Sequence, residues 1–415
     1  MKSRFINNVI KQRSKSPMGR IMVITGARQV GKTTIAKHCY TDFQYISIED
    51  PLLRSSYANL TAEQWNAYYP KAILDEVQKE PVLIESIKSV YDQFDAARYV
   101  LLGSSQLLLM QKVRESLAGR CIIEEIYPLC LPEMLTNDIE QEIVLSMFQQ
   151  FLTSFSLHPM LPDFKLAPNY AKRKKAYEYY LQYGGYPALV NENFTNADRQ
   201  LWLDNYIRTY LERDIRDLAE FRNLEPFVKT QKIAALLTGK LINFSSIAKE
   251  ANISVKTVQR FFQYLEISYQ TLTLQPWHRN PLKKLSKSPK LHFLDPGIQR
   301  TILQKTGELN GNEFESAIIA ELYKQAKAIH FTGSFYHLNT LDGREVDLLI
   351  ETENGYMAFE IKSTINVTST DCRHLKNLAP ILDKPLLQSF IISNDDQVKT
   401  FDNNILALPA AMFLT

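Results

Sequence analysis

The sequence contains few cysteines, and they do not form the short-range patterns of metal or redox sites. Its 415 residues include four, Cys39, Cys121, Cys130 and Cys372, without a C-x-x-C pair. Such wide spacing argues against a disulfide framework or a zinc site, and it is typical of small apolar side chains in a reducing compartment. We therefore expect four free thiols.

Export signals and long apolar runs are also missing. The first residues are polar and basic, and they lack the apolar segment of a signal peptide. No apolar run approaches the ~18 residues that a membrane helix needs. These absences predict a cytoplasmic protein without a membrane partner.

Net charge is small, at +3, so the overall charge does not identify a partner. Its distribution is uneven, because residues 1–41 contain nine Lys or Arg and no acid, and residues 267–294 contain five and again no acid. A third basic run covers 172–175. Basic stretches attract phosphate backbones, but they also occur on solvated faces and beside bound nucleotide. Nucleic acid is therefore one candidate partner.

Apolar residues make up 45% of the chain, which is enough for a large core, and its length suggests about three domains. Strand-like apolar runs alternate with helical stretches in the first third, which predicts an α/β fold with a parallel sheet. The five runs are 20–25, 44–48, 72–74, 98–102 and 121–127. We divide the chain into an α/β core over 1–135, a helical lid region over 136–225, a helix-turn-helix or winged-helix region over 226–285 and a C-terminal α/β domain over 286–415.

The first predicted strand runs into the pattern G-x-x-x-x-G-K-[ST]. Its residues are Gly26, Ala27, Arg28, Gln29, Val30, Gly31, Lys32 and Thr33, and Thr34 follows in the next helix. Glycines let such a loop turn its N–H groups toward phosphate oxygens, and the following helix adds its positive end. Lys32 is expected to reach the outer phosphates, and the Thr33 hydroxyl to bind Mg²⁺. The pattern predicts an ATP site.

Two carboxylates end the third predicted strand. Asp75 is the candidate second metal-binding residue, acting through the water shell of Mg²⁺. Glu76 is the candidate residue that orients and polarises the attacking water, so it favours hydrolysis over simple binding. The alternative is a strand that merely ends in acidic residues.

The next two strands have polar side chains at their ends. Ser104 and Ser105 follow the strand 98–102, where a hydroxyl can sense the γ-phosphate or simply cap a helix. Arg120 precedes the last strand of the core, where it can point at the ATP of a neighbouring subunit or remain an ordinary surface arginine. A role for Arg120 toward a neighbour would require a homo-oligomer.

Residues 244–265 have the pattern of a helix-turn-helix. We expect Ser245 and Ser254 to cap its two helices. The second helix would present polar side chains suited to a DNA groove, namely Lys256, Thr257, Gln259, Arg260 and Gln263. The alternative is a winged-helix module that only packs against protein.

Carboxylates recur in a predicted C-terminal hairpin. Asn354-Gly355 predicts a two-residue turn, which would place Asp347 opposite Lys362 and Glu360 diagonal to Asp347 on one face. Two carboxylates and a lysine on one face can bind Mg²⁺ and activate water for phosphodiester cleavage. The helix before the hairpin could add Glu315.

These motifs resemble those of AAA-type ATPases, and more narrowly a bacterial and archaeal family with a nuclease-like C-terminal domain of unassigned function. The segments that carry the resemblance are GARQVGKTT from Gly26, ILDEVQ from Ile73, LLGSSQ from Leu101, LAGR from Leu117, YGGYP from Tyr183, YLERDI from Tyr210, SPKL from Ser288 and FLDPG from Phe293. The family usually has Thr at the position of Pro296. The resemblance implies an arginine-finger role for Arg120 and a sensor role for Ser104 or Ser105.

The C-terminal residues resemble the PD-(D/E)XK nuclease pattern, with Asp347, Glu360, Lys362 and upstream Glu315. They depart from it in lacking a proline before Asp347. The resemblance implies a restriction-endonuclease-like domain, either active or kept only for binding. Two functions follow as alternatives: an ATP-driven enzyme acting on nucleic acid, or a nucleotide-switched binding or signalling protein with an inactive C-terminal domain.

Overall fold

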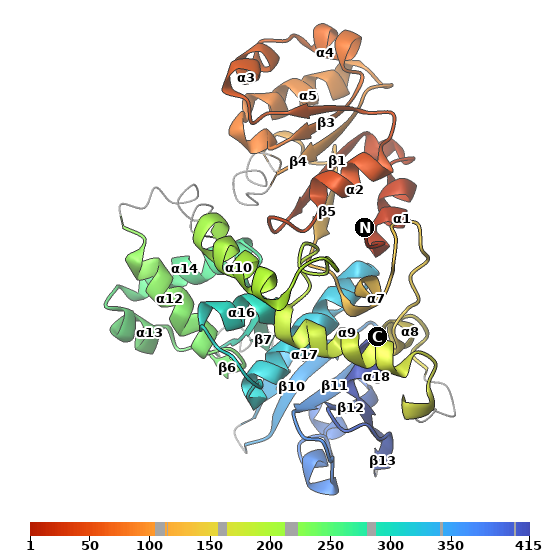
Figure 1. The fold of residues 1–415 in the computed structure, drawn as a ribbon, viewed down its shortest axis with the longest axis vertical. Helices are drawn as coiled ribbons and strands as arrows, with labels where there is room; N and C mark the ends of the chain where they lie inside the picture. The colour runs from red at the N-terminus through yellow and green to blue at the C-terminus, as the bar shows by residue number, and fades with distance from the viewer. Residues whose placement is uncertain are drawn as a thin grey trace.

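The computed structural model describes residues 1–103, 113, 115–156, 164–211, 223–279, 288–340, 343–401 and 404–415. The chain begins with helix α1 (Phe5–Arg13) and continues into a five-stranded sheet (Figure 1). Its strands are β1 (Ile21–Gly26), β2 (Gln44–Ser47), β3 (Lys71–Asp75), β4 (Arg98–Leu102) and β5 (Ile122–Ile126). They are all parallel, in the order β2-β3-β4-β1-β5. This confirms the predicted parallel sheet and the positions of its five strands.

Helices cover both faces of this sheet because its strands are apolar on both sides. The connecting helices are α2 (Lys32–Cys39), α3 (Pro51–Ala58), α4 (Ala62–Tyr68) and α5 (Val82–Gln93). Helices α1 and α2 pack on one face, against Met22 and Ile24 of β1. Helices α4 and α5 pack on the other, against Ile21 and Val23. Because all five strands are parallel, the carboxyl ends of β1 and β3 lie at the same edge of the sheet.

A helical segment connects this sheet to the rest of the molecule. Its helices are α7 (Leu131–Met134), α8 (Met147–Ser154), α9 (Tyr170–Tyr183) and α10 (Asn196–Tyr206), and a π-helical turn (Ile207–Leu211) extends α10. In Figure 1, α10 extends from the lower body toward the five-stranded sheet. One hydrophobic core continues from the α2 face of that sheet through these helices into the C-terminal part.

The described residues of 223–279 and 288–293 form three helices and three strands, which include the predicted helix-turn-helix. They are α12 (Glu225–Leu236), β6 (Lys240–Leu241), α13 (Phe244–Ala251), α14 (Val255–Ile267), β7 (Thr271–Pro276) and β8 (Lys290–Phe293). Ser254 caps α14 as predicted, but the prediction that Ser245 caps the first helix is wrong. The side chain of Asn243 accepts the capping hydrogen bond from Ser246 N, so α13 starts two residues earlier than a cap at Ser245 would allow.

The C-terminal part is a large mixed sheet with helices on it. Its elements are α16 (Pro296–Ile302), α17 (Gly311–Ala328), β9 (Ser334–Asn339), β10 (Glu345–Glu351), β11 (Tyr356–Lys362), β12 (Leu386–Ser393), β13 (Lys399–Phe401), β14 (Ile405–Pro409) and α18 (Ala410–Leu414). The strand order is β13-β14-β12-β11-β10-β9-β7-β8-β6. Because β7 pairs with both β8 and β9, this sheet crosses the predicted domain boundary at 285/286.

All four cysteines lie in described segments, and all four are free thiols. None of the helices in the described part of the chain combines the length and apolarity that a membrane crossing requires.

Candidate functional site

The loop between β1 and α2 depends on two glycines. A Cβ at Gly26 would lie 2.1 Å from the carbonyl oxygen of Ile126 in β5, so a larger residue does not fit there. Gly31 precedes α2 with φ 95°, and Gln29 also has a positive φ of 62°. Alternating right- and left-handed residues before a helix form a concave site of N–H groups for anions. The loop has the backbone shape that binding a phosphate requires.

Lys32 follows directly as the first residue of α2. Its side chain is buried, and Nζ donates hydrogen bonds to the carbonyl oxygens of Gly26 at 2.9 Å and Ala27 at 2.8 Å. The ammonium group therefore lies folded against the loop, where it is close to any phosphate that the loop binds.

Thr33 and Asp75, the two residues predicted to bind magnesium at this loop, are in contact. The Thr33 hydroxyl donates to Oδ2 of Asp75 at 2.7 Å, and the Tyr45 hydroxyl donates to the same oxygen at 2.9 Å. Burial and the Asp75 carboxylate raise the pKa of Tyr45, so it remains a hydrogen-bond donor at neutral pH. These oxygen donors fit Mg²⁺, which prefers a carboxylate and a hydroxyl beside substrate phosphates. Tyr45 was not predicted as a site residue, and an isolated tyrosine in a strand gives no signal of such a contact.

Glu76 lies just beyond β3 in an unusual backbone conformation. Its φ of 57° and ψ of 38° are in the left-handed region, which costs energy for a residue with a side chain. The side-chain amide of Gln78 donates a hydrogen bond to its carboxylate. Glu76 therefore lies next to Asp75 at the nucleotide edge of the sheet, with a neighbour that orients its carboxylate.

Arg120 lies at the opposite edge of the sheet. It forms a two-point ion pair with Asp92 of α5, with distances of 2.8 and 3.3 Å. Because β5 runs from this edge to the loop edge, Arg120 is roughly 20 Å from Gly26 along the strand. It cannot reach the nucleotide site of its own chain. Ser104 and Ser105, the predicted sensors, lie outside the described residues.

The second helix of the helix-turn-helix presents a polar face. Lys256, Gln259, Arg260 and Gln263 are exposed, and Thr257 is half-buried. Its opposite face packs Val258 and Leu265 into the core, as predicted. The helix therefore has the amphipathic form that groove binding requires, a form that also suits protein contacts.

In the C-terminal hairpin the predicted register is wrong by two residues. Glu351 pairs with Tyr356 and Leu348 with Phe359, so Asp347 aligns with Glu360 rather than with Lys362. The turn differs because the Thr352 hydroxyl accepts hydrogen bonds from Asn354 N and Gly355 N, and Asn354 lacks the positive φ of the predicted turn. A shift of two residues preserves alternation, so the predicted face is unchanged.

The carboxylates of this face surround a lysine that the sequence did not identify as a site residue. Lys290 of β8 is buried, and its Nζ lies 2.7 Å from Glu315, 3.0 Å from Glu345 and 3.4 Å from Asp347. Lys362 is paired with Glu360 at 2.7 Å. We call this group the carboxylate cluster, and its six residues are Lys290, Glu315, Glu345, Asp347, Glu360 and Lys362. In the sequence, Lys290 was only one of a basic run, and its role depends on the β7–β8 pairing.

Burial and mutual repulsion shift the ionisation of this cluster. Burial and the neighbouring Asp347 raise the pKa of Glu315 well above its usual range, although Lys290 opposes this. The same causes raise the pKa of Glu360 to about 8. Within the described ranges, no three Asp, Glu, His or Cys side chains are placed to hold a metal ion. The predicted metal role of Glu315, Asp347 and Glu360 stays a prediction.

Three family models match successive parts of the chain. Residues 18–135 match the model of an AAA domain. This segment is an AAA-type P-loop domain. Residues 174–309 match DUF8612 and residues 310–413 match DUF4143, each a domain of unknown function. The AAA domain contains the loop, Asp75 and Glu76, whereas the carboxylate cluster lies in the other two matched regions.

Two relatives align with most of this chain, and neither is described with an activity. An uncharacterized protein of Mycobacterium tuberculosis is 23% identical over 95% of this chain and 81% of its own length. An uncharacterized protein of Methanocaldococcus jannaschii is 26% identical over 85% of this chain and 76% of its own.

Among solved structures, a Walker-type ATPase of Pyrococcus abyssi aligns over 73% of this chain and 98% of its own, with 15% identity and a TM-score of 0.43. The ORC2 protein of Aeropyrum pernix aligns over 77% and 94%, with 12% identity and a TM-score of 0.35. These scores are too low to indicate the function of this chain.

Proposed function

We propose that this protein is a Mg²⁺-dependent ATPase that acts on nucleic acid. The observation that carries the ATPase proposal is the 2.7 Å hydrogen bond between Thr33 and Asp75 beside the Gly26–Thr33 loop. This contact brings a hydroxyl and a carboxylate together where the outer phosphates of ATP would lie. When bound, Mg²⁺ neutralises charge on those phosphates.

Each site residue of the AAA domain has a distinct role in this proposal. Loop N–H groups bind the phosphates, and Lys32 moves from the carbonyl oxygens of Gly26 and Ala27 to the outer phosphates. Glu76 orients water for attack on the γ-phosphate. Its hydrogen bond from Gln78 holds the carboxylate at the nucleotide edge. The positioned charges thereby supply most of the expected rate enhancement.

The test separates binding from turnover. Lys32→Ala is expected to lose MgATP binding, whereas Glu76→Gln keeps binding and loses at least about 100-fold in kcat. Lys79→Ala is the matched control, because this half-buried lysine pairs with the exposed Glu49 in the same domain. Binding is measured by calorimetry and turnover by phosphate release. Wild-type turnover in purified Glu76→Gln would show that the assignment of Glu76 is wrong.

Nucleic acid is the proposed partner because α14 exposes Lys256 and Arg260 together with two glutamines. Basic and amide side chains on one helix face suit phosphate and base contacts. Replacing both basic residues by alanine is expected to weaken DNA binding and to reduce its log–log salt slope by about 2. The control removes Lys71 and Lys79, which pair with acids on the AAA domain. If both double variants lost the same amount of DNA affinity, DNA binding would depend on net charge and not on α14.

Cleavage is a second candidate, favoured by the convergence of Glu315, Asp347 and Glu360 with Lys362. A Mn²⁺-dependent nicking assay comparing wild type with Asp347→Ala tests it. Activity confined to the wild type supports cleavage. Equal activity in both proteins, or none in either, would support a C-terminal domain that only recognises a DNA or protein partner.

A further inference from the structure

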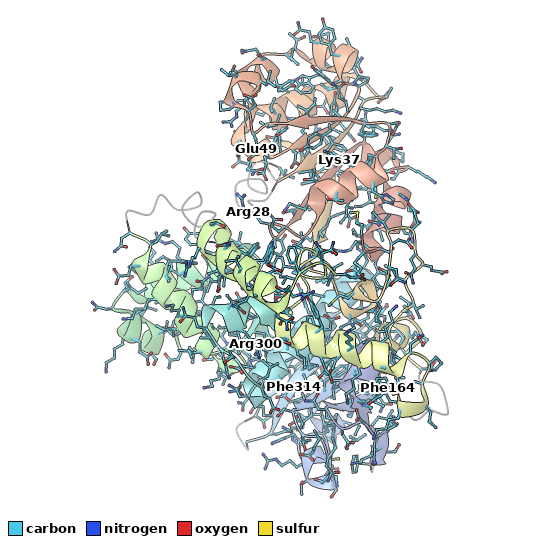
Figure 2. The ribbon with its side chains drawn as sticks, viewed as in Figure 1. Arg28, Lys37, Glu49, Phe164, Arg300 and Phe314 are labelled. Carbon is cyan, nitrogen blue, oxygen red and sulfur yellow. The ribbon has the colours of Figure 1, made fainter. Side chains whose placement is uncertain are left out.

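Two side chains from outside the loop hold its peptide groups. The Tyr206 hydroxyl donates a hydrogen bond to the carbonyl oxygen of Arg28 at 3.2 Å. Nη1 of Arg4 donates to the carbonyl oxygen of Val30 at 3.1 Å. Tyr206 is the last residue of α10, more than 70 residues beyond the part of the chain that matches an AAA domain. In Figure 2, Arg28 lies on the side of that domain that faces α10.

These hydrogen bonds determine where the loop N–H groups point. In a planar trans peptide the C=O and the next N–H point in opposite directions. Because Tyr206 holds the Arg28 carbonyl toward α10, the N–H of Gln29 points away from α10. Arg4 acts in the same way on the N–H of Gly31. Gln29 and Gly31 both have positive φ, a conformation on which the concave N–H site depends.

We propose that Tyr206 is a positioning residue of the nucleotide site, which orients the Arg28–Gln29 peptide for phosphate binding. The proposal rests on the proposed ATP function and assigns part of that site to α10. Tyr206 meets the loop at the carbonyl oxygen of Arg28, so it acts through the peptide group that it holds.

Tyr206 is itself held firmly. Its side chain is 1% exposed, and its ring stacks on Trp202 with centroids 5.0 Å apart and an interplanar angle of 15°. The Tyr186 hydroxyl lies 3.1 Å from the Tyr206 hydroxyl. Because the single proton of Tyr206 is donated to Arg28, Tyr186 is the donor in this second hydrogen bond. The arrangement fixes the Tyr206 hydroxyl from two sides.

Residues next to Tyr186 extend this series of contacts toward the carboxylate cluster. Tyr186 follows Gly185, whose N–H donates to Oδ2 of Asp295 at 2.8 Å. A side chain at Gly184 would meet the Asp295 carboxylate at 1.9 Å, so this approach requires glycine. Asp295 comes two residues after β8, the strand that carries Lys290. The motifs YGGYP and FLDPG therefore connect the nucleotide loop with the strand of Lys290.

The test removes one hydroxyl and keeps the ring. Tyr206→Phe is expected to weaken MgATP binding about five-fold, the factor that one ordinary hydrogen bond contributes. The KM for ATP should rise by the same factor while kcat is unchanged, because the loop binds ground state and transition state alike. Tyr180→Phe is the matched control: Tyr180 is equally buried, and its hydroxyl donates to the carbonyl oxygen of Ala317 at 3.0 Å, away from the loop. It should lower stability without changing the KM.

A second variant keeps the proposal testable if Tyr206→Phe does not fold. Tyr186→Phe removes the partner of Tyr206 and should raise the KM by about two-fold, since the Arg28 hydrogen bond remains but is held less firmly. The double variant should be no worse than Tyr206→Phe alone. An unchanged KM in the Tyr206 and Tyr186 variants, with binding lost in Lys32→Ala, would overturn the positioning role and leave the ATP function intact. Absence of MgATP binding in the wild type would overturn both.

Discussion

The ionisation of Glu360 affects the stability of the C-terminal domain, because its pKa differs between the folded and unfolded states. Its ordinary pKa of 4.5 is raised to about 8 in the folded protein, by burial first and then by Asp347. Between these two values the folded state holds a proton that the unfolded state lacks, so the free energy of unfolding falls as pH rises. Below pH 4.5 and above pH 8 this contribution no longer changes.

Glu360→Gln should therefore stabilise the protein increasingly from pH 5 to pH 8, because glutamine resembles the protonated acid and needs no proton. The difference from wild type should grow by at most about 1.4 kcal/mol per pH unit and then level off. Urea unfolding at four pH values measures it. Glu353→Gln is the control, since Glu353 is an exposed carboxylate at the tip of the same hairpin. A difference from wild type that does not vary with pH would contradict the raised pKa.

At the scale of single elements, substitutions at the start of α13 can distinguish the observed N-cap, Asn243, from the expected one, Ser245. Asn243 Oδ1 accepts from Ser246 N at 3.0 Å, whereas Ser245 is exposed in the first turn. Asn243→Ala is expected to lower the free energy of unfolding by about 1 kcal/mol, because it leaves a helix N–H without its partner. Ser245→Ala should change it by less than about 0.5 kcal/mol. Reversed magnitudes in urea unfolding would mean that Ser245 caps the helix in solution.

Elements formed by local signals were predictable from the sequence. The strands of the AAA domain are continuous apolar runs between turn residues, and the Gly26–Thr33 loop combines a specific motif with that context. Asp75 and Glu76 were predictable for the same reason, since a strand that ends in acids places them at the loop edge. The structure brings Thr33 and Asp75 into contact, and their role toward Mg²⁺ stays a prediction.

Features that depend on distant pairing were not predictable. Lys290 reaches Glu315, Glu345 and Asp347 only because β7 pairs with β8 on one side and β9 on the other. Tyr206 meets the loop from 178 positions away along the chain. The hairpin register, in contrast, was missed for a local reason, because the Thr352 hydroxyl competes with the Asn354-Gly355 turn. Local periodicity contains no information about such partners, so only the folded arrangement reveals them.

At the scale of the whole molecule, Arg120 bears on whether the active species is an assembly. It lies at the edge of the sheet opposite the loop, paired with Asp92. An exposed ion pair of this kind contributes little to stability, so stability alone gives little reason for an arginine there. An arginine that stabilises the transferring phosphoryl group from a neighbour would occupy such an outward position. We therefore predict that Arg120→Ala loses ATPase activity, with nucleotide binding unchanged.

Mixing two inactive variants tests this prediction in solution. Lys32→Ala lacks a working loop but retains Arg120, and Arg120→Ala has the reverse defect. If Arg120 acts on a neighbour, a 1:1 mixture forms interfaces in which an intact loop meets an intact arginine, and random assembly restores about a quarter of wild-type activity. Asp92→Ala, which removes only the ion-pair partner, should remain active. A mixture as inactive as its components, or a strict monomer by sedimentation with and without ATP, would confine Arg120 to the surface of its own chain.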